Sequence, residues 1–132
     1  MSTIMLDTNI VSALMRDPGG VVAQRIGALS TAASVSVVVA AELRYGAARK
    51  GSQRLTAAVE AILGAIEIAP FAPPADLVYA HLRNRMERAG RPFPGNDLLI
   101  AAHALTLGRG LATDDRAFER VPGLHVENWL AQ

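Results

Sequence analysis

Four acidic side chains lie where an apolar run or a Gly/Pro loop gives way to a predicted helix: Asp7, Glu42, Asp97 and Asp115. In an open parallel sheet, the turns from strand to helix gather at one edge, which is the usual ligand crevice. Carboxylates in one pocket repel one another unless protons or a hard cation neutralise them, and Mg²⁺ or Mn²⁺ suits an all-oxygen site. The pattern therefore predicts a divalent-cation site of the kind that hydrolyses phosphodiester bonds.

Each acid also has a purely structural explanation. Asp7, Asp97 and Asp115 could cap helices, at about 1 kcal/mol each. Glu42 could be a first-turn acid placed favourably against the helix dipole. Their combination favours chemistry, because Asp97 leads from a Pro/Gly loop into an apolar helix, where an idle carboxylate would be costly. The sequence alone leaves both explanations open.

Short apolar runs alternate with helical patterns along the chain. Strands are predicted at 3–6, 34–39, 67–69, 111–113 and 124–126, of which Ser34–Val39 is the clearest because it is rich in β-branched residues. Helices are predicted over 10–15, 21–29, 40–50, 55–66, from Pro73-Pro74 to about 88, 97–107 and 117–120. This alternation predicts a single α/β domain over residues 1–132, with a mainly parallel central sheet flanked by helices.

Composition excludes several classes of protein. The chain has no cysteine, which rules out disulfides and thiolate metal sites, and its three histidines lack zinc-ligand spacing. No run approaches the roughly 18 apolar residues of a membrane span. The N-terminus has an acid in its first apolar run and lacks the basic region of a signal peptide. We therefore expect a cytoplasmic protein with no membrane partner.

Four segments carry the acids in a fixed order: Met5-Leu6-Asp7-Thr8-Asn9-Ile10, Ala41-Glu42-Leu43-Arg44-Tyr45-Gly46-Ala47, Asn96-Asp97-Leu98-Leu99-Ile100-Ala101-Ala102-His103-Ala104 and Ala112-Thr113-Asp114-Asp115-Arg116-Ala117-Phe118. In order and spacing they resemble the PIN-domain family, and within it the VapC-type toxins of bacterial toxin–antitoxin pairs. Two further segments, 120–124 and 127–129, also resemble these toxins. The resemblance covers nearly the whole chain.

The resemblance implies a small endoribonuclease that depends on Mg²⁺ or Mn²⁺. Asp7, Glu42 and Asp97 match the three central acids of that family. The family's fourth acid usually lies two places after a threonine, which favours Asp115, although a shift of one residue would select Asp114 instead. Asp7, Asp97 and Asp115 are expected to hold the metal directly or through water, and Glu42 to join them or to orient the attacking water.

Other residues of these segments are expected to support the site. Thr8, Asn9 and Thr113 would orient the acids or a bound water, and Arg116 would contact a substrate phosphate. Further basic residues follow the second acidic turn and precede the third. They would either contact flanking phosphates or form solvated helix faces: Arg44, Arg49, Lys50, Arg54, Arg83, Arg85, Arg88 and Arg91.

The resemblance also implies partners. A VapC-type toxin pairs with an antitoxin that covers apolar helices and blocks the acidic pocket. Such a toxin acts on RNA and forms a homodimer. The apolar stripes of 21–29 and 55–66 would either receive the antitoxin or belong to the core. The main alternative function is a catalytically silent PIN-like module that binds protein or RNA.

Overall fold

The computed structural model describes residues 2–131. Its centre is a five-stranded sheet built from short strands: β1 (Ile4–Leu6), β2 (Ala33–Ser36), β3 (Glu67–Ala69), β4 (Gly110–Ala112) and β5 (Val126–Glu127). The strand order is β3-β2-β1-β4-β5, and every pairing between these strands is parallel. The prediction of an α/β domain with a mainly parallel sheet is therefore confirmed.

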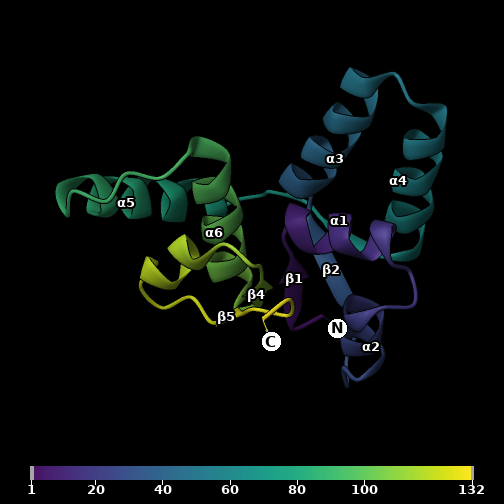
Figure 1. Ribbon diagram of the computed structural model, residues 1–132. Coiled ribbons are helices and arrows are strands. Elements are labelled where there is room, and N and C mark those ends of the chain that lie inside the picture. The colour runs from purple at the N-terminus through teal and green to yellow at the C-terminus, as the bar shows by residue number, and fades with distance from the viewer. Residues whose placement is uncertain (1, 132) are drawn as a thin grey trace.

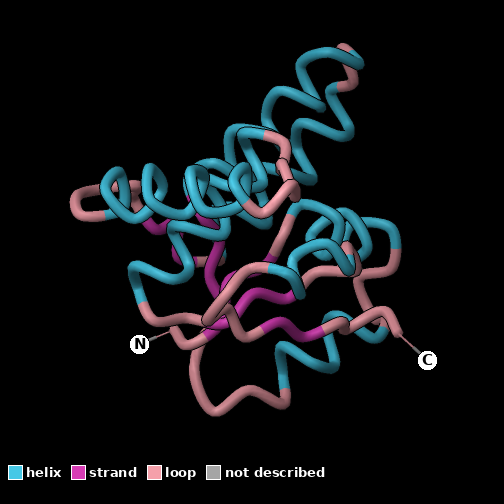
Figure 2. The backbone as a smooth tube through the Cα atoms, turned by 90° about the vertical axis from the view of Figure 1, so that its left-hand side faces the viewer, coloured by secondary structure: helices cyan, strands magenta, loops and turns pink. Residues whose placement is uncertain are grey.

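Six α-helices and one 3₁₀ helix accompany this sheet within residues 2–131: α1 (Thr8–Arg16), α2 (Val21–Gly27), α3 (Val37–Lys50), α4 (Gln53–Ala65), α5 (Ala75–Arg88), α6 (Gly95–Leu107) and the 3₁₀ helix η1 (Arg116–Arg120). Figure 1 shows α3 and α4 as a pair that projects away from the sheet, while α5 packs against α6 on the other side. The strands lie near the middle of the molecule, with helices on either side (Figure 2). No helix of the described chain is long and apolar enough to cross a membrane.

Helix α6 passes through the core, as its nearly uniform apolar character predicts. Leu98 and Ile100 are fully buried, and so are the alanines that follow them. The same core contains all of β1 and the rings of Phe118 and Trp129. Because α6 and β1 are surrounded by apolar side chains, the acids at their ends are attached to the most constrained parts of the molecule.

The prediction of a strand over Ser34–Val39 is wrong in its second half. Strand β2 ends at Ser36, and the three valines that follow open helix α3. The Ser36 hydroxyl accepts the backbone N–H of Val38 at 3.0 Å, which is an N-cap. This cap and the burial of Val39 outweigh the β-propensity of the valine run. Glu42 consequently lies in the second turn of its helix, and not at the start.

Helix α6 begins two residues earlier than predicted, at Gly95. Asp97 is therefore a first-turn residue, and Pro94 occupies the capping position. The sequence had left capping open for Asp97, and the structure excludes it. An acid in the first turn still interacts favourably with the helix dipole.

Candidate active site

The carboxyl ends of β1 and β4 bring two distant segments together. The strands pair so that Leu6 lies opposite Ala112, and each is followed by a polar residue, Asp7 and Thr113. The Thr113 hydroxyl donates a hydrogen bond of 2.8 Å to Oδ2 of Asp7, and the Thr8 backbone N–H donates one of 2.8 Å to Oδ1. Asp7 is only 5% exposed and caps α1, so its carboxylate is fixed on both oxygens.

Thr113 and Asn9 tie the two loops to each other. Thr113 Oγ1 accepts hydrogen bonds from the Asp115 backbone N–H at 3.1 Å and from the Asn9 amide at 3.3 Å. The Asn9 carbonyl oxygen in turn accepts the Asp114 backbone N–H at 3.4 Å. The two bonds of Asn9 connect residues more than a hundred positions apart, and they hold the turn after β4 against the start of α1.

Glu42 reaches the same place from helix α3. Its Oε1 accepts the Thr8 hydroxyl at 2.6 Å, and its Oε2 accepts the Asn96 amide at 3.4 Å. Thr8 thus contacts two acids, Asp7 through its backbone and Glu42 through its side chain. Asn96 lies in the first turn of α6, directly before Asp97, and sequence reasoning gave it no role. Its position next to a predicted site acid was the only signal that could have singled it out.

The four acids lie close enough for their charges to act on one another. The pKa of Asp97 is raised to about 6, first by burial and then by the negative charges of Asp7, Asp115 and Glu42. The pKa of Asp7 is also raised, mainly by burial, although its hydrogen bonds with Thr113 and Thr8 oppose the rise. Within residues 2–131, no lysine or arginine forms an ion pair with any of the four. Their shared negative charge is left uncompensated.

Asp115 and Asp114 differ in their relation to this cluster. Asp115 lies after β4 and raises the pKa of both Asp7 and Asp97, whereas Asp114 has no such effect. Asp115 also caps η1, because its Oδ1 accepts the Ala117 backbone N–H at 3.0 Å. Capping and proximity to the other acids are therefore combined in one residue, as they are for Asp7.

The cluster offers suitable ligands to a hard cation, although these ligands do not form a complete coordination shell. All candidate ligand atoms are carboxylate oxygens, which Mg²⁺ and Mn²⁺ prefer. In the described part of the chain, no three acidic or histidine side chains stand in metal-binding geometry. Mutual repulsion of uncompensated carboxylates opposes their closer approach, and a divalent cation would remove that repulsion.

A groove of about 560 Å³ adjoins the acids and runs between α1, α3 and α4. Its lining includes Thr8 and Glu42 together with the basic residues Arg16, Lys50 and Arg54. The apolar part of the lining comes from Met15, Leu43, Ala47, Leu55, Ala58 and Val59. Part of the apolar stripe of α4 therefore faces this groove, whereas α2 contributes no residue to it.

The remaining basic candidates have different surroundings. Arg44 is paired with Glu60 at 2.9 Å and Arg83 with Glu87 at 3.0 Å, which agrees with solvated helix faces for these two. Arg116 is exposed next to Asp115. His81 and His125 are exposed, whereas His103 is buried in α6.

Comparison with known proteins decides the family. The protein-family model described as PIN domain matches residues 4–124 of this chain. The chain belongs to the PIN domain family. It is 34% identical over 129 residues to the ribonuclease VapC2 of Rickettsia felis, covering 95% of this chain and 96% of that protein. It is 29% identical to the tRNA(fMet)-specific endonuclease VapC of Salmonella typhimurium, covering 98% and 99%.

A solved structure agrees with these relatives over the whole fold. VapBC2 from Rickettsia felis, bound to a DNA fragment from its promoter, superimposes on this PIN domain with a TM-score of 0.90 at 31% identity. The match covers 96% of this chain and 98% of that one. The resemblance to VapC-type PIN domains, inferred from four short segments, is therefore confirmed at the level of family and fold.

Proposed function

We propose that this PIN domain is a metal-dependent endoribonuclease that acts as the toxin of a toxin–antitoxin pair. The observation that carries the proposal is the cluster of Asp7, Glu42, Asp97 and Asp115, whose acids have no basic partner within residues 2–131. Burial and then the negative charges of the other three acids raise the pKa of Asp97 to about 6. A purely structural cluster would gain nothing from this repulsion, whereas a cation-binding site requires concentrated negative charge. PIN ribonucleases generally depend on a divalent metal, and the VapC relatives are ribonucleases.

In this proposal, Asp7, Asp97 and Asp115 hold Mg²⁺ or Mn²⁺ directly or through water. The bound ion supplies Lewis acidity toward a phosphate oxygen and activates water. Asp7 is kept in place by Thr8 and Thr113, so it needs little reorganisation.

Glu42 either joins these three ligands or orients the attacking water. It is held by the Thr8 hydroxyl and the Asn96 amide, and one side of its environment opens into the groove. A substrate strand entering there would meet the basic residues of the groove, and the exposed Arg116 next to Asp115 would bind a further phosphate.

The antitoxin is proposed to lie in the groove between α1, α3 and α4. Apolar side chains there suit the apolar face of a helix, and Glu42 offers an acceptor to a basic side chain that would block the acids. The groove is continuous with the cluster, so one segment could fill both. A homodimer and a cytoplasmic location remain expectations from the family. The Salmonella relative makes transfer RNA the first substrate to test.

Removal of metal should abolish RNA cleavage. We expect the purified protein to cut RNA in Mg²⁺ or Mn²⁺, to stop in EDTA, and to recover when the metal is restored, since the acids alone repel phosphate. Gel analysis of labelled transfer RNA and total RNA measures this. Cleavage that persists in EDTA would contradict the mechanism. RNA binding without cleavage under all metal conditions would favour the silent binding module.

The neighbouring acids Asp114 and Asp115 provide a matched pair for the same assay. Asp115→Asn should lower cleavage by about 10-fold or more, because it removes a charge that acts on Asp7 and Asp97. Asp114→Asn makes the same chemical change one residue away and should keep most of the activity. The opposite ranking would assign the fourth acid to Asp114.

Metal affinity should fall with decreasing pH. Protons and the cation compete for Asp97, so below its pKa of about 6 the Mn²⁺ affinity should drop by about 10-fold per pH unit. Titrations of Mn²⁺ by calorimetry between pH 5 and pH 7.5 measure the slope. An affinity that is flat between pH 5 and pH 6 would show that Asp97 does not bind the metal.

A further inference from the structure

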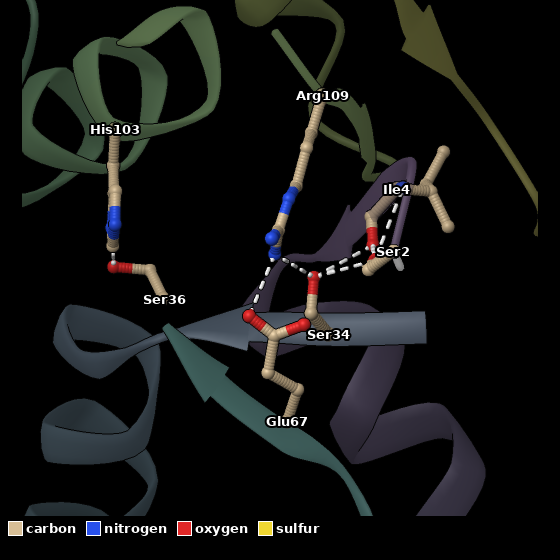
Figure 3. A network of polar contacts seen from close by, with 7 residues as sticks. All are labelled: Ser2, Ile4, Ser34, Ser36, Glu67, His103 and Arg109. Carbon is tan, nitrogen blue, oxygen red and sulfur yellow. Dashed lines mark hydrogen bonds and ion pairs between the residues drawn. The ribbon is translucent and has the colours of Figure 1, made fainter. Parts of the chain in front are cut away.

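A buried hydrogen bond joins the start of α3 to the middle of α6. His103 Nδ1 and Ser36 Oγ lie 2.7 Å apart, and the two residues are 1% and 0% exposed. Figure 3 shows the His103 ring directed from α6 toward Ser36 at the end of β2. The Phe71 ring packs against the imidazole in a T-shaped arrangement with a centroid distance of 5.2 Å. The mechanism proposed above uses neither residue.

The surroundings of Ser36 favour one direction for this hydrogen bond. The Ser36 hydroxyl accepts the Val38 backbone N–H, and no other acceptor for its own proton is found within residues 2–131, so it donates to His103 Nδ1. The ring therefore carries its proton on Nε2, which has no partner in hydrogen-bond geometry in the described chain. Burial lowers the pKa of His103 despite the Pro70 carbonyl nearby, so the ring is neutral. Its bond to Ser36 depends on Nδ1 alone.

The two helices joined by this bond each carry a site acid at the same sequence distance. Glu42 follows Ser36 by six residues along α3, and Asp97 precedes His103 by six residues along α6. Ser36 is also the N-cap that fixes where α3 begins. A shift of α6 against the start of α3 would therefore change how the two carboxylates face each other.

We propose that His103 is a positioning residue of the acid site, acting through Ser36 to set the placement of the Asp97 helix relative to the Glu42 helix. The proposal rests on the proposed nuclease function, since it assumes that the cluster binds a divalent cation. Rigid support of this kind matters because residues that orient ligands typically change metal affinity or activity by about 10- to 100-fold when removed.

The same strand supplies a matched control. Ser34 is fully buried, two residues before Ser36 on β2, and also makes a side-chain contact with the α6–β4 side of the molecule. Its hydroxyl donates to the Ile4 carbonyl at 2.9 Å and accepts from Arg109 at 3.1 Å, while Arg109 also pairs with Glu67 (Figure 3). This contact lies toward the start of β2 and involves neither Ser36 nor His103. When the Ser34 hydroxyl is removed, Arg109 is still held to the end of α6, because its backbone N–H donates to the Ala104 carbonyl at 3.0 Å. Loss of the Ser34 contact should therefore affect stability alone.

Three substitutions at the two positions test the proposal. His103→Leu removes Nδ1 and keeps an apolar side chain, whereas His103→Asn retains an acceptor, because its Oδ1 occupies the place of Nδ1. Ser34→Ala removes the control contact. For each protein we would measure unfolding by urea, the Mn²⁺ concentration that gives half of the metal-induced rise in melting temperature, and the rate of RNA cleavage.

We expect His103→Leu to raise the half-effective Mn²⁺ concentration by about 10-fold and to slow cleavage by about as much. His103→Asn should stay within about 3-fold of the wild type in its half-effective Mn²⁺ concentration and in its cleavage rate. Ser34→Ala should lose stability without a change in Mn²⁺ binding or in cleavage. If His103→Leu binds Mn²⁺ as the wild type does, or if Ser34→Ala shifts Mn²⁺ binding equally, the positioning role is refuted. If His103→Leu does not fold, His103→Phe removes Nδ1 while keeping an aromatic ring. Weakened Mn²⁺ binding by that protein supports the role, and normal binding refutes it.

Failure of the proposed function gives a different result. A wild-type protein that binds Mn²⁺ and never cleaves RNA would reject the nuclease, while the Mn²⁺ measurements would still decide the role of His103. A wild-type protein that binds no Mn²⁺ at all would overturn both proposals.

Discussion

Replacing Asp97 with asparagine should abolish RNA cleavage and at the same time raise the stability of the metal-free protein. Loss of a metal-binding charge should lower the rate by about 100-fold or more. Stability should rise because the charge of Asp97 is partly buried and is repelled by three other acids. Asparagine would lose no hydrogen bond, since none to the Asp97 side chain is found within residues 2–131. After allowance for solvent screening we expect a gain of about 1 kcal/mol at pH 7.5.

The sign of this effect depends on pH. The pKa of Asp97 is about 6 in the folded protein against an ordinary value of 3.8, so its stabilising contribution is complete below pH 3.8 and is lost as the pH rises through 6. The advantage of Asp97→Asn should therefore vanish near pH 4. Thermal unfolding in EDTA at pH 4 and pH 7.5 measures it. Added Mn²⁺ should reverse the ranking at pH 7.5, because it stabilises only the wild type.

Asp76 offers the matched substitution for that experiment. It is an exposed aspartate in the first turn of α5, as Asp97 is a first-turn residue of α6. Asp76→Asn removes a charge that favours its helix dipole, so stability should stay level or fall slightly, with cleavage unchanged. Equal gains in stability at both positions would mean that net charge, and not the acid cluster, is responsible.

Expression of this chain alone in a bacterial host should arrest growth. A toxin nuclease destroys RNA that its host needs, whereas a silent PIN domain would be harmless. Colony counts and growth curves after brief induction measure the effect, and mapping of new RNA ends identifies the substrate. Co-expression of the protein encoded next to it should restore growth if that protein is the antitoxin.

The control for toxicity is the Asp97→Asn protein, expressed to the same level. It should be harmless, because it retains the surface of the wild type and lacks the proposed chemistry. Arrest by both proteins would point to sequestration of RNA or protein in place of cleavage. Normal growth with wild-type protein at equal abundance would count against the toxin role.

The parts of the site that follow strands could be predicted from sequence. Parallel strands end at the same edge of a sheet, so Asp7 after β1 and Thr113 after β4 were expected at one edge. Their direct contact also depends on β1 pairing with β4, which the sequence did not predict. The prediction of four convergent acids rested on this rule and on the motif order. The roles of the individual acids stay predictions until the substitutions are made.

Other features depend on contacts that no local pattern contains. The start of α3 at Val37 follows from the Ser36 cap and from burial, which overcame a run of three valines. The position of Asn96 against Glu42 requires the docking of α6 on α3, and the bond between Ser36 and His103 spans 67 residues. The groove exists only because α3 and α4 fold into a pair beside α1.

The hydrogen bond between Thr113 and Asp7 has a consequence for synthesis of the protein. Asp7 and Thr113 lie 106 positions apart, so many residues are made between the two halves of the pocket. A nascent or prematurely terminated polypeptide that stops before Gly110 has no β4 beside β1 and no fourth acid. A cell translating such a message therefore carries no complete acidic pocket on any copy until Asp115 has been added.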